Sequence, residues 1–245
     1  MSMKRVTLQP AYVLHRRPYR ETSFLVELFS QEYGRITVVA SGARKTKSAT
    51  QGLLQPFIPL VVSFSGKGEL MALSHVEASG SVARLQGDCL FAGFYLNELL
   101  TVLLQKWDAH NELYRLYEEA LQGLHASELQ QAVLRTFELR LLEELGYGIL
   151  PKDSGELAAM FLAEKYYRFI PEHGFVLSEL DKHAANTSNV FLGKSLLAMA
   201  QENWQDESCL KDAKRLIRFV LTPLLGARQI YSRQLFIHRE VTHEA

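Results

Sequence analysis

The amino-acid sequence predicts a multi-domain α+β protein, in which a five-stranded β-barrel is followed by an all-helical domain. Through the first 80 residues, apolar residues alternate with polar ones or form short β-branched runs, which is typical of strands. After Gly80 the apolar residues recur about every 3.6 positions, which is typical of amphipathic helices. We therefore expect two domains, at residues 1–80 and 81–245.

The first domain is expected to contain five short strands. Turn-forming tetrapeptides at residues 31–34 and 65–68 separate apolar runs. Five strands in about 80 residues suit a closed barrel, because closure leaves no exposed sheet edge. The OB-fold is the commonest barrel of this kind, and an SH3-like barrel is the alternative. The expected strands are 11–15, 24–29, 35–40, 57–64 and 70–76.

The second domain is expected to begin with a central helix at residues 88–106. This segment is apolar on nearly every side, which predicts a buried helix. Asn111 is placed to cap the next helix. Ser127 and Gln130, three residues apart, form a capping box for the helix after it, which Gly146 ends.

The rest of the second domain is expected to alternate between irregular chain and helix. Residues 147–182 form an irregular insert with a hairpin at 167–177. Pro223 should kink or end the last long helix. The two helices of this part begin at Ser188 or Asn189 and at Asp206 or Ser208.

The formal net charge of zero hides a strong asymmetry along the chain. Residues 1–80 carry ten Lys and Arg against five Asp and Glu, residues 81–210 carry ten against nineteen, and residues 211–245 carry seven against three. Two basic ends around an acidic middle indicate a surface for a polyanion. The alternative is chance clustering of charges on solvated faces.

Cysteine usage and apolar run length favour a cytoplasmic protein without a membrane segment. Cys89 and Cys209 are too few for a disulfide framework or a four-cysteine zinc site, which fits a reducing compartment. The first residues lack the apolar region of a secretory signal. The longest apolar run, 90–104, contains Asn97 and Glu98 and is shorter than the roughly 20 residues that a membrane span needs.

Motifs of the common enzyme classes are not found in the sequence. The nearest match to a phosphate-binding loop, at 188–195, starts with Ser188 rather than Gly and falls in a predicted helix. The patterns G-x-S-x-G, H-E-x-x-H and C-x-x-C are absent, and the eight histidines lack ligand spacing. We therefore expect no catalytic residue, no metal and no cofactor. A hydrolase with an unrecognised site is the alternative.

Basic and aromatic residues gather instead in the first domain. Single-stranded nucleic acid is bound by cationic grooves that follow the phosphates and by aromatic rings on which bases stack. Tyr19, Phe24 and Tyr33 are candidate stacking residues, with Phe24 better suited to the barrel core. The candidate DNA-contacting residues, three of them in an acid-free loop, are Arg16, Arg20, Arg35, Arg44, Lys45 and Lys47.

A second basic surface is predicted on the last long helix. One face carries four cations at the spacing i, i+3, i+4, i+7, namely Lys211, Lys214, Arg215 and Arg218. Four like charges on one face repel each other without an anionic partner, so we predict DNA contact here. Plain solvation of this face is the alternative.

Arg135 lies in an apolar helical segment, where a cation needs a counter-charge. An internal ion pair with Glu138 or Glu98 would supply it. The alternative is capture of a partner's carboxylate beside an apolar pocket.

Short motifs spread along the chain occur together in one known family. They are Ala-Tyr-Val-Leu-His-Arg-Arg-Pro-Tyr-Arg-Glu-Thr-Ser at 11–23, Gly-Arg at 34–35, Ala-Ser-Gly-Ala-Arg at 40–44, Leu-Gln-Pro-Phe at 54–57, Tyr-Leu-Asn-Glu-Leu at 95–99, Phe-Glu-Leu at 137–139, Leu-Gly-Tyr-Gly at 145–148, Ala-Lys-Arg at 213–215, Leu-Gly at 225–226 and Ser-Arg at 232–233. In this order the sequence resembles the bacterial RecO family of recombination mediators, and the resemblance covers nearly the whole chain.

The resemblance implies an N-terminal OB-fold joined to an all-helical domain. It implies binding of single- and double-stranded DNA, annealing of complementary strands, and contact with single-strand-binding protein and RecR, which together help to load the recombinase RecA onto coated DNA. Such a protein would be cytoplasmic and nucleoid-associated. In the family the acidic, apolar-ended tail of single-strand-binding protein docks on the helical domain, and the matching position here is Arg135.

One departure from the family pattern concerns metal. Many members carry a four-cysteine zinc site after the Gly-Tyr motif, whereas residues 151–155 here read Pro-Lys-Asp-Ser-Gly. We therefore predict no metal, and a folded insert must be held together by packing. The competing interpretation of the whole chain is an RNA-binding OB-fold protein without a repair role.

Overall fold

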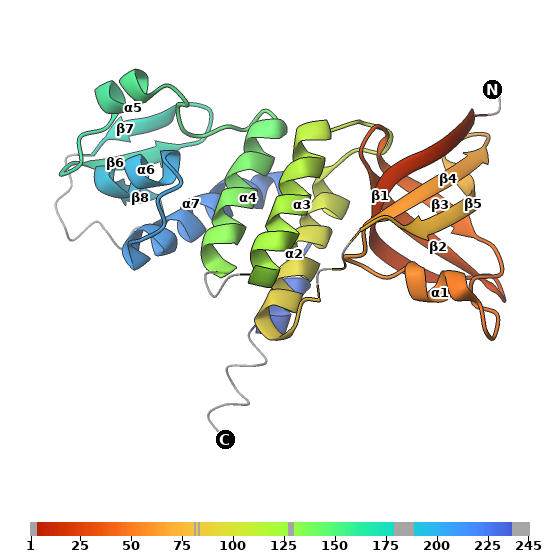
Figure 1. Ribbon diagram of the computed structural model, residues 1–245. Coiled ribbons are helices and arrows are strands. Elements are labelled where there is room, and N and C mark those ends of the chain that lie inside the picture. Colours follow the sequence, from red (N-terminus) through yellow and green to blue (C-terminus); the bar gives the residue numbers. More distant parts are fainter. Residues whose placement is uncertain (1–3, 81, 83, 127–129, 179–188, 237–245) are drawn as a thin grey trace. The chain divides into compact units, whose positions relative to one another are not determined.

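A computed structural model describes residues 4–80, 82, 84–126, 130–178 and 189–236. It is an α+β structure, as predicted, with strands in the N-terminal part and mainly helices after it (Figure 1). The chain divides into two compact units, the first formed by residues 1–130 with 228–245 and the second by residues 131–227. Strands give way to helices after residue 80, whereas the compact units change at residue 130.

Five strands of the first unit close into a barrel in the order β1-β2-β3-β5-β4. β3 and β5 run parallel, and the other neighbouring strands run antiparallel. All five predicted strands are present. They are β1 (Lys4–Tyr19), β2 (Ser23–Ser30), β3 (Gly34–Ala40), β4 (Leu60–Gly66) and β5 (Leu70–Ala78).

Two of these strands differ in extent from the prediction. β1 has 16 residues because it pairs with β4 along its first half and with β2 along its second half. Register shifts after Val6 and after Val13 interrupt its alternation, which concealed its full length in the sequence. β4 begins later than predicted, at Leu60, because Phe57 has a φ of 68° that a strand excludes.

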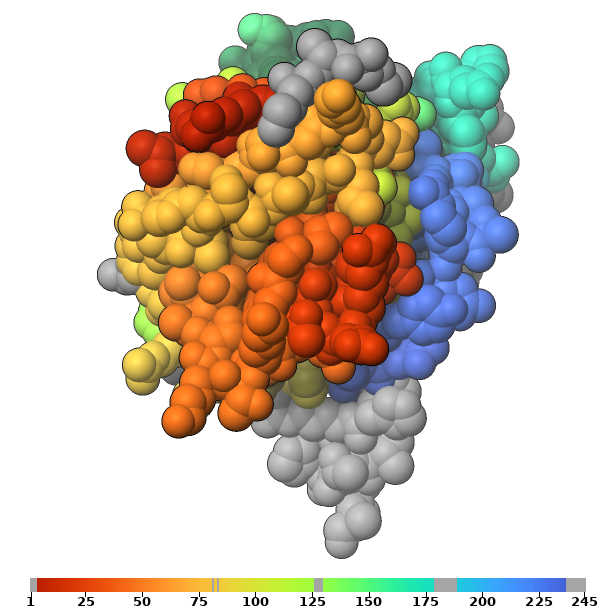
Figure 2. Space-filling model, turned by 90° about the vertical axis from the view of Figure 1, so that its right-hand side faces the viewer, coloured from red at the N-terminus to blue at the C-terminus, as the bar shows by residue number. Residues whose placement is uncertain are grey.

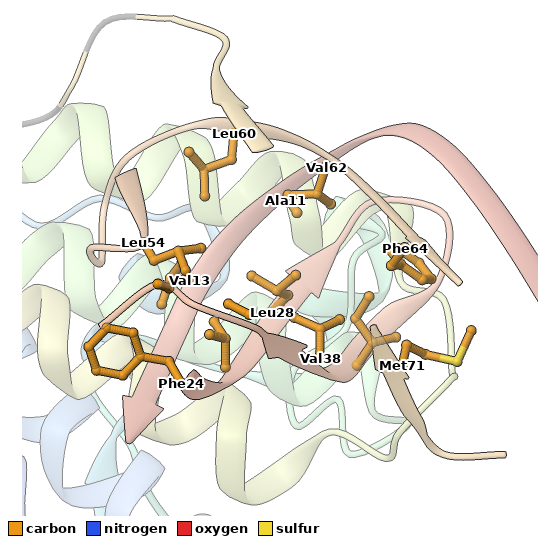
Figure 3. Packing of buried hydrophobic residues seen from close by; sticks show 14 of the residues in the cluster. Ala11, Val13, Phe24, Leu28, Val38, Leu54, Leu60, Val62, Phe64 and Met71 are labelled. Carbon is orange, nitrogen blue, oxygen red and sulfur yellow. The ribbon is translucent and has the colours of Figure 1, made fainter. Parts of the chain in front are cut away.

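Alternate residues of the strands fill the barrel. Val26 and Leu28 lie two positions apart on β2, and both are fully buried together with Val38 of β3. In Figure 3 the labelled side chains of different strands converge on the barrel interior. Burial of one such side chain contributes about 1.5–3 kcal/mol, which is why a sequence period of two located the strands.

Two helices of the first unit join the barrel through a buried asparagine. The helices are α2 (Gly87–Leu103) and α3 (Asn111–Ala126). Asn97 of α2 donates through Nδ2 to the carbonyl oxygens of Val13 (3.3 Å) and Leu14 (3.0 Å) in β1. Its Oδ1 accepts a hydrogen bond of 2.5 Å from the hydroxyl of Tyr117 in α3. One side chain therefore connects β1 to both helices.

Aromatic rings surround this asparagine. The ring centroids of Tyr12 and Tyr117 lie 5.2 Å apart, and those of Phe29 and Tyr114 lie 5.5 Å apart. The Tyr12 hydroxyl donates to Glu118 Oε1 at 3.1 Å. Burial, with the nearby carboxylate, raises the pKa of Tyr12 well above its usual value. The hydroxyls therefore remain protonated donors.

The chain after α2 closes one end of the barrel. Gly34 has a φ of 60°, and a Cβ at this position would lie 1.7 Å from the carbonyl oxygen of Asp108, so only glycine fits. The Trp107 N–H donates to the carbonyl oxygen of Arg35 at 3.0 Å. The Trp107 ring packs against the barrel core.

The second unit is not all-helical, which corrects the prediction for this part of the chain. A three-stranded sheet in the order β7-β6-β8 accompanies its helices. The elements are α4 (Gln130–Glu144), α5 (Ser154–Met160), β6 (Tyr166–Ile170), β7 (Gly174–Leu177), β8 (Val190–Leu192), α6 (Gly193–Ala200) and α7 (Glu207–Leu225). The predicted hairpin is confirmed as β6 and β7.

The prediction that a helix starts at Ser188 or Asn189 was wrong. Ser188 lies outside the described residues, and Val190 begins the strand β8, which pairs with β6. The helix α6 begins only at Gly193. Three consecutive apolar residues have no readable period, so pairing with β6 decided the conformation. The short helices α1 (Ala49–Leu53) and α5 were not predicted because they span only five and seven residues.

Helix ends followed local chemistry more closely. The Asp206 carboxylate accepts from the Ser208 N–H at 2.9 Å and caps α7, as predicted. Gly146, two residues after the last residue of α4, has a φ of 82°, as expected of a residue that ends a helix. Pro223 lies in the last turn of α7 and does not stop the helix before Leu225. Ser127 of the predicted capping box lies outside the described residues.

None of the helices in the described parts of the chain is long and apolar enough to cross a membrane.

Removal of the Asn97 side chain tests the connection between β1 and the helices. We expect Asn97→Ala to lower the free energy of unfolding by about 3 kcal/mol, because it removes three hydrogen bonds inside a buried aromatic cluster. The control is Thr101→Ala, one turn later on α2, whose hydroxyl bonds only to the main chain of its own helix. Urea unfolding should show a loss below about 1 kcal/mol for the control; equal losses would contradict the role of Asn97.

Candidate nucleic-acid interface

The turn between β1 and β2 carries the first group of predicted cations. Arg20 is exposed, and its guanidinium lies 5.2 Å from the centre of the Tyr19 ring. Arg44 binds this turn twice, through its N–H to the Thr22 carbonyl oxygen (2.9 Å) and through Nη1 to the Arg20 carbonyl oxygen (3.1 Å). The turn and the loop after β3 therefore form one surface, and the two segments lie side by side in Figure 2, in red and orange.

The loop after β3 is anchored at its base and exposed beyond it. Ala43 is buried in the barrel core, and its N–H donates to the Ala40 carbonyl oxygen at 3.4 Å. Arg44, Lys45 and Lys47 follow directly and are all exposed. Because the loop contains no acidic residue, its cations lack a carboxylate neighbour along the chain.

Arg16 connects this surface to α1. Its Nη1 donates to the Gln51 carbonyl oxygen at 2.8 Å, and its guanidinium lies 4.7 Å from the centre of the Phe24 ring. Partial burial lowers the pKa of Arg16, although arginine keeps its charge in proteins. Arg17, its neighbour in the basic stretch at the end of β1, is exposed.

Arg35 lies apart from this group. It stands at the start of β3, whereas the basic loop follows the end of that strand. Its Nη1 lies 3.4 Å from Glu27 Oε2, and its Nε donates to the Leu104 carbonyl oxygen at 3.1 Å. Arg35 therefore makes contacts inside the first unit, where its hydrogen bond to Leu104 holds the chain that follows α2.

The three aromatic residues predicted to stack on bases also differ in their surroundings. Phe24 belongs to the barrel core. The Tyr33 ring packs edge-on against Trp107, with Lys4 Nζ 4.5 Å from its centre. Tyr19 lies beside Arg20 of the turn and is the one ring of the three that is not part of the barrel core or packed against it. We refer to Arg16, Tyr19, Arg20, Arg44, Lys45 and Lys47 as the loop cluster.

The predicted basic face of α7 is also formed. It lines a hollow of about 340 Å³, whose walls are Lys211, Lys214, Arg215, Arg218, Phe219 and Thr222. Arg215 is half-buried, and its Nη2 donates to the Val190 carbonyl oxygen at 2.7 Å. Lys211 lies 2.9 Å from Glu207, one turn earlier on the helix. We refer to this feature as the α7 hollow.

Arg135 on α4 is buried, with 5% of its side chain exposed. Its Nη2 lies 2.9 Å from Glu138 Oε2, so the internal ion pair predicted as one alternative is present. Glu98 is not its partner, because that carboxylate accepts the N–H groups of Tyr231 and Ser232 at 2.8 Å. Nε of Arg135 has no hydrogen-bond partner among the described residues.

A charged recess that the sequence analysis missed lies further along α4. Arg140 Nε lies 2.6 Å from Glu202 Oε1, and Glu143 accepts from both Arg140 (3.2 Å) and Lys152 (3.1 Å). The recess has a volume of about 180 Å³, and its remaining wall is largely apolar: Leu139, Ile149, Leu150, Pro151, Met199 and Ala200. The i, i+3 pair of Arg140 and Glu143 was the only signal of it in the sequence.

The cysteine-free insert is held together by aromatic packing. The Phe161 ring lies 5.0 Å from that of Tyr167 and 5.2 Å from that of Phe175. Phe169 and Phe175 are 5.1 Å apart, and Phe191 of β8 completes the group. In the part of the chain that the structure describes, no three His, Cys, Asp or Glu side chains gather as metal ligands would.

The segment that resembles a phosphate-binding loop has a different structure from the one predicted. It was expected inside a helix, but β8 passes directly into α6, with Leu192 as the N-cap and Gly193 as the first helical residue. A Cβ on Gly193 would lie 2.0 Å from the Leu162 carbonyl oxygen, so this glycine serves close packing. Lys194 Nζ lies 3.1 Å from Asp206 Oδ2. The strand and helix leave no loop between them that could surround a phosphate.

Comparison with known proteins identifies related chains. A family model described as "Recombination protein O N terminal" matches residues 3–82, and one described as "Recombination protein O C terminal" matches residues 84–233. The chain is 43% identical over 232 residues to DNA repair protein RecO of Coxiella burnetii, covering 95% of this chain and 98% of the relative. It is similar to DNA repair protein RecO of Methylococcus capsulatus (43% identity, 95% and 93% covered) and of Dechloromonas aromatica (39% identity, 95% and 96% covered).

Replacement of the buried pair on α4 tests its internal role. Removal of one partner leaves a buried charge, so we expect Glu138→Leu to lower the free energy of unfolding by about 3–5 kcal/mol. The double variant Arg135→Leu/Glu138→Leu should be more stable than Glu138→Leu, because no charge then remains buried. Urea unfolding of the wild type and the two variants measures this; a double variant no more stable than Glu138→Leu would contradict it.

Proposed function

Because the chain belongs to the recombination protein O family, we propose that it is a recombination mediator that acts in DNA repair by binding. In this proposal it binds single- and double-stranded DNA and anneals complementary strands. With RecR it helps to load the recombinase RecA onto DNA coated by single-strand-binding protein. We propose that it does this without making or breaking covalent bonds.

The loop cluster is the observation on which the proposal depends. It combines exposed cations, an exposed turn and one ring, Tyr19, on two segments that hydrogen bonds hold together. Cations of this kind neutralise phosphates and release counterions, and a ring offers a face for a base. Neutralisation of two strands also lowers their mutual repulsion, which favours annealing.

We also propose that the barrel is an OB-fold. The strand order and the parallel β3–β5 pair support this, as does the helix α1 between β3 and β4. OB-folds bind single-stranded nucleic acids through loops and strand faces. An RNA-binding role is the alternative. Competition between DNA and RNA oligonucleotides of matched sequence separates the two roles, and we expect the protein to bind DNA with the higher affinity.

The helical part is proposed to bind the acidic, apolar-ended tail of single-strand-binding protein at α4, with Arg135 as the predicted contact. Two observations support α4 as the binding site for the tail. Arg135 keeps one buried nitrogen without a hydrogen-bond partner among the described residues. Arg140, on the same helix, stands with 38% of its side chain exposed at the recess with the apolar wall. An apolar side chain would pack on that wall, and a partner's carboxylate would compete with Glu143 and Glu202 for Arg140.

Charge reversal in the loop cluster tests DNA binding. Five phosphate contacts predict a log–log salt slope of roughly −3.5 on single strands. Arg44→Glu/Lys45→Glu should weaken binding at least about tenfold and make the slope shallower by about 1.4, because two contacts are lost. The control Arg5→Glu/Lys67→Glu makes the same charge change near the start of β1, away from the β1–β2 turn. Fluorescence anisotropy with labelled oligonucleotides measures both; equal affinities for the two variants would exclude the loop cluster.

Titration with a tail peptide tests the partner site. The peptide is acidic and ends in an apolar residue, and its amidated form is the control for the terminal carboxylate. Arg135→Leu/Glu138→Leu removes the guanidinium without leaving a buried charge, so we expect binding to weaken at least about tenfold. The variant Arg140→Ala tests separately whether the tail peptide binds at the recess. If calorimetry gives the wild-type affinity for both variants, the tail does not bind at α4.

A further inference from the structure

The α7 hollow has the composition of a phosphate-binding site. Four of its six lining residues are cations, and none is acidic. The two carboxylates nearest in sequence are engaged on the helix itself, since Glu207 pairs with Lys211 and Asp212 with Arg215. The hollow is open, so an extended ligand can lie across it.

Arg215 is held in place before any ligand binds. Its Nη2 donates to the Val190 carbonyl oxygen and to Asp212 Oδ1, both at 2.7 Å. Its guanidinium also lies 4.6 Å from the centre of the Phe191 ring. An arginine fixed from three sides loses little side-chain entropy when it binds an anion. Its neighbours Lys211, Lys214 and Arg218 are exposed.

The length of the basic face matches a strand rather than a single phosphate. Lys211 and Arg218 are seven positions apart on a helix, which separates them by about 10 Å along its axis. Phosphates of one stacked strand follow each other at a rise of about 3.4 Å. The face therefore spans about three phosphates, and Phe219 in the wall offers an apolar surface beside them.

We propose that the α7 hollow binds the phosphodiester backbone of a second nucleic-acid strand, while the loop cluster binds the first. This rests on the proposed function, because it assumes that the loop cluster binds DNA. The two sites belong to different compact units, and the chain passes from one unit to the other twice, near residues 130 and 227. One molecule then holds two strands, and their encounter becomes intramolecular, with a raised effective concentration.

Four proteins test this proposal. They are the wild type, the hollow variant Lys214→Glu/Arg218→Glu, the loop variant Arg44→Glu/Lys45→Glu, and the control Lys165→Glu/Lys194→Glu, which changes two exposed cations of the second unit that do not line the hollow. The probe is a single-stranded oligothymidylate, which cannot pair with itself. Native mass spectrometry counts the strands bound by one protein, and anisotropy gives the affinity for the first strand. Circular dichroism melting confirms that each variant is folded.

We expect the wild type and the control to bind two strands per protein, and the hollow variant to bind one. The hollow variant should keep its affinity for the first strand within about twofold and should anneal complementary strands at least about tenfold more slowly than the control. Two strands on the hollow variant, or one strand on the wild type, would overturn the second site and leave the proposed function intact. A wild type that binds no strand would overturn both.

Discussion

The buried contact between Asn97 and β1 is the interaction on which the position of the loop cluster depends. β1 is the strand shared by β2 and β4, and its far end carries Arg16, Tyr19 and the turn. Asn97 fixes the middle of that strand to α2 and, through Tyr117, to α3. A polar side chain buried among aromatic rings is strongly directional, because any other orientation leaves its donors and acceptors unpaired. The barrel and its helices therefore form one unit with a fixed basic end.

Two groups of cations in the chain differ in burial. Arg35 and Arg135 lie in ion pairs with Glu27 and Glu138, where desolvation makes each charge costly unless its partner stays in place. Cations of the loop cluster are mostly exposed, and their hydrogen bonds run largely to main-chain carbonyl oxygens. A guanidinium that binds a carbonyl group is oriented but keeps its net charge. Cations of this second group can neutralise phosphates without loss of an internal pair.

Much of the fold followed from the sequence, and the failures have a common physical cause. The strand alternation and the caps at Asp206 and Gly146 are local effects, so the sequence around each was sufficient. β8 and the length of β1 depend on pairing with distant strands, which a local pattern does not contain. The candidate site shows the same contrast between local and distant effects. The spacing on α7 placed four cations on one face, whereas the internal use of Arg35 depends on the Leu104 carbonyl oxygen, far away in the chain.

The proposed function, which is binding without a covalent step, sets its own requirement on these surfaces. A protein that brings strands together must also release the duplex, so its contacts must be numerous and individually weak. Exposed lysines and arginines meet this condition, because each contributes little and salt screens them. Specific placement then comes from the main chain: Ala43 anchors the basic loop, and the Val190 carbonyl oxygen anchors Arg215. Loss of such an anchor would leave the net charge unchanged and still scatter the cations, so the proposed binding depends on their positions more than on their number.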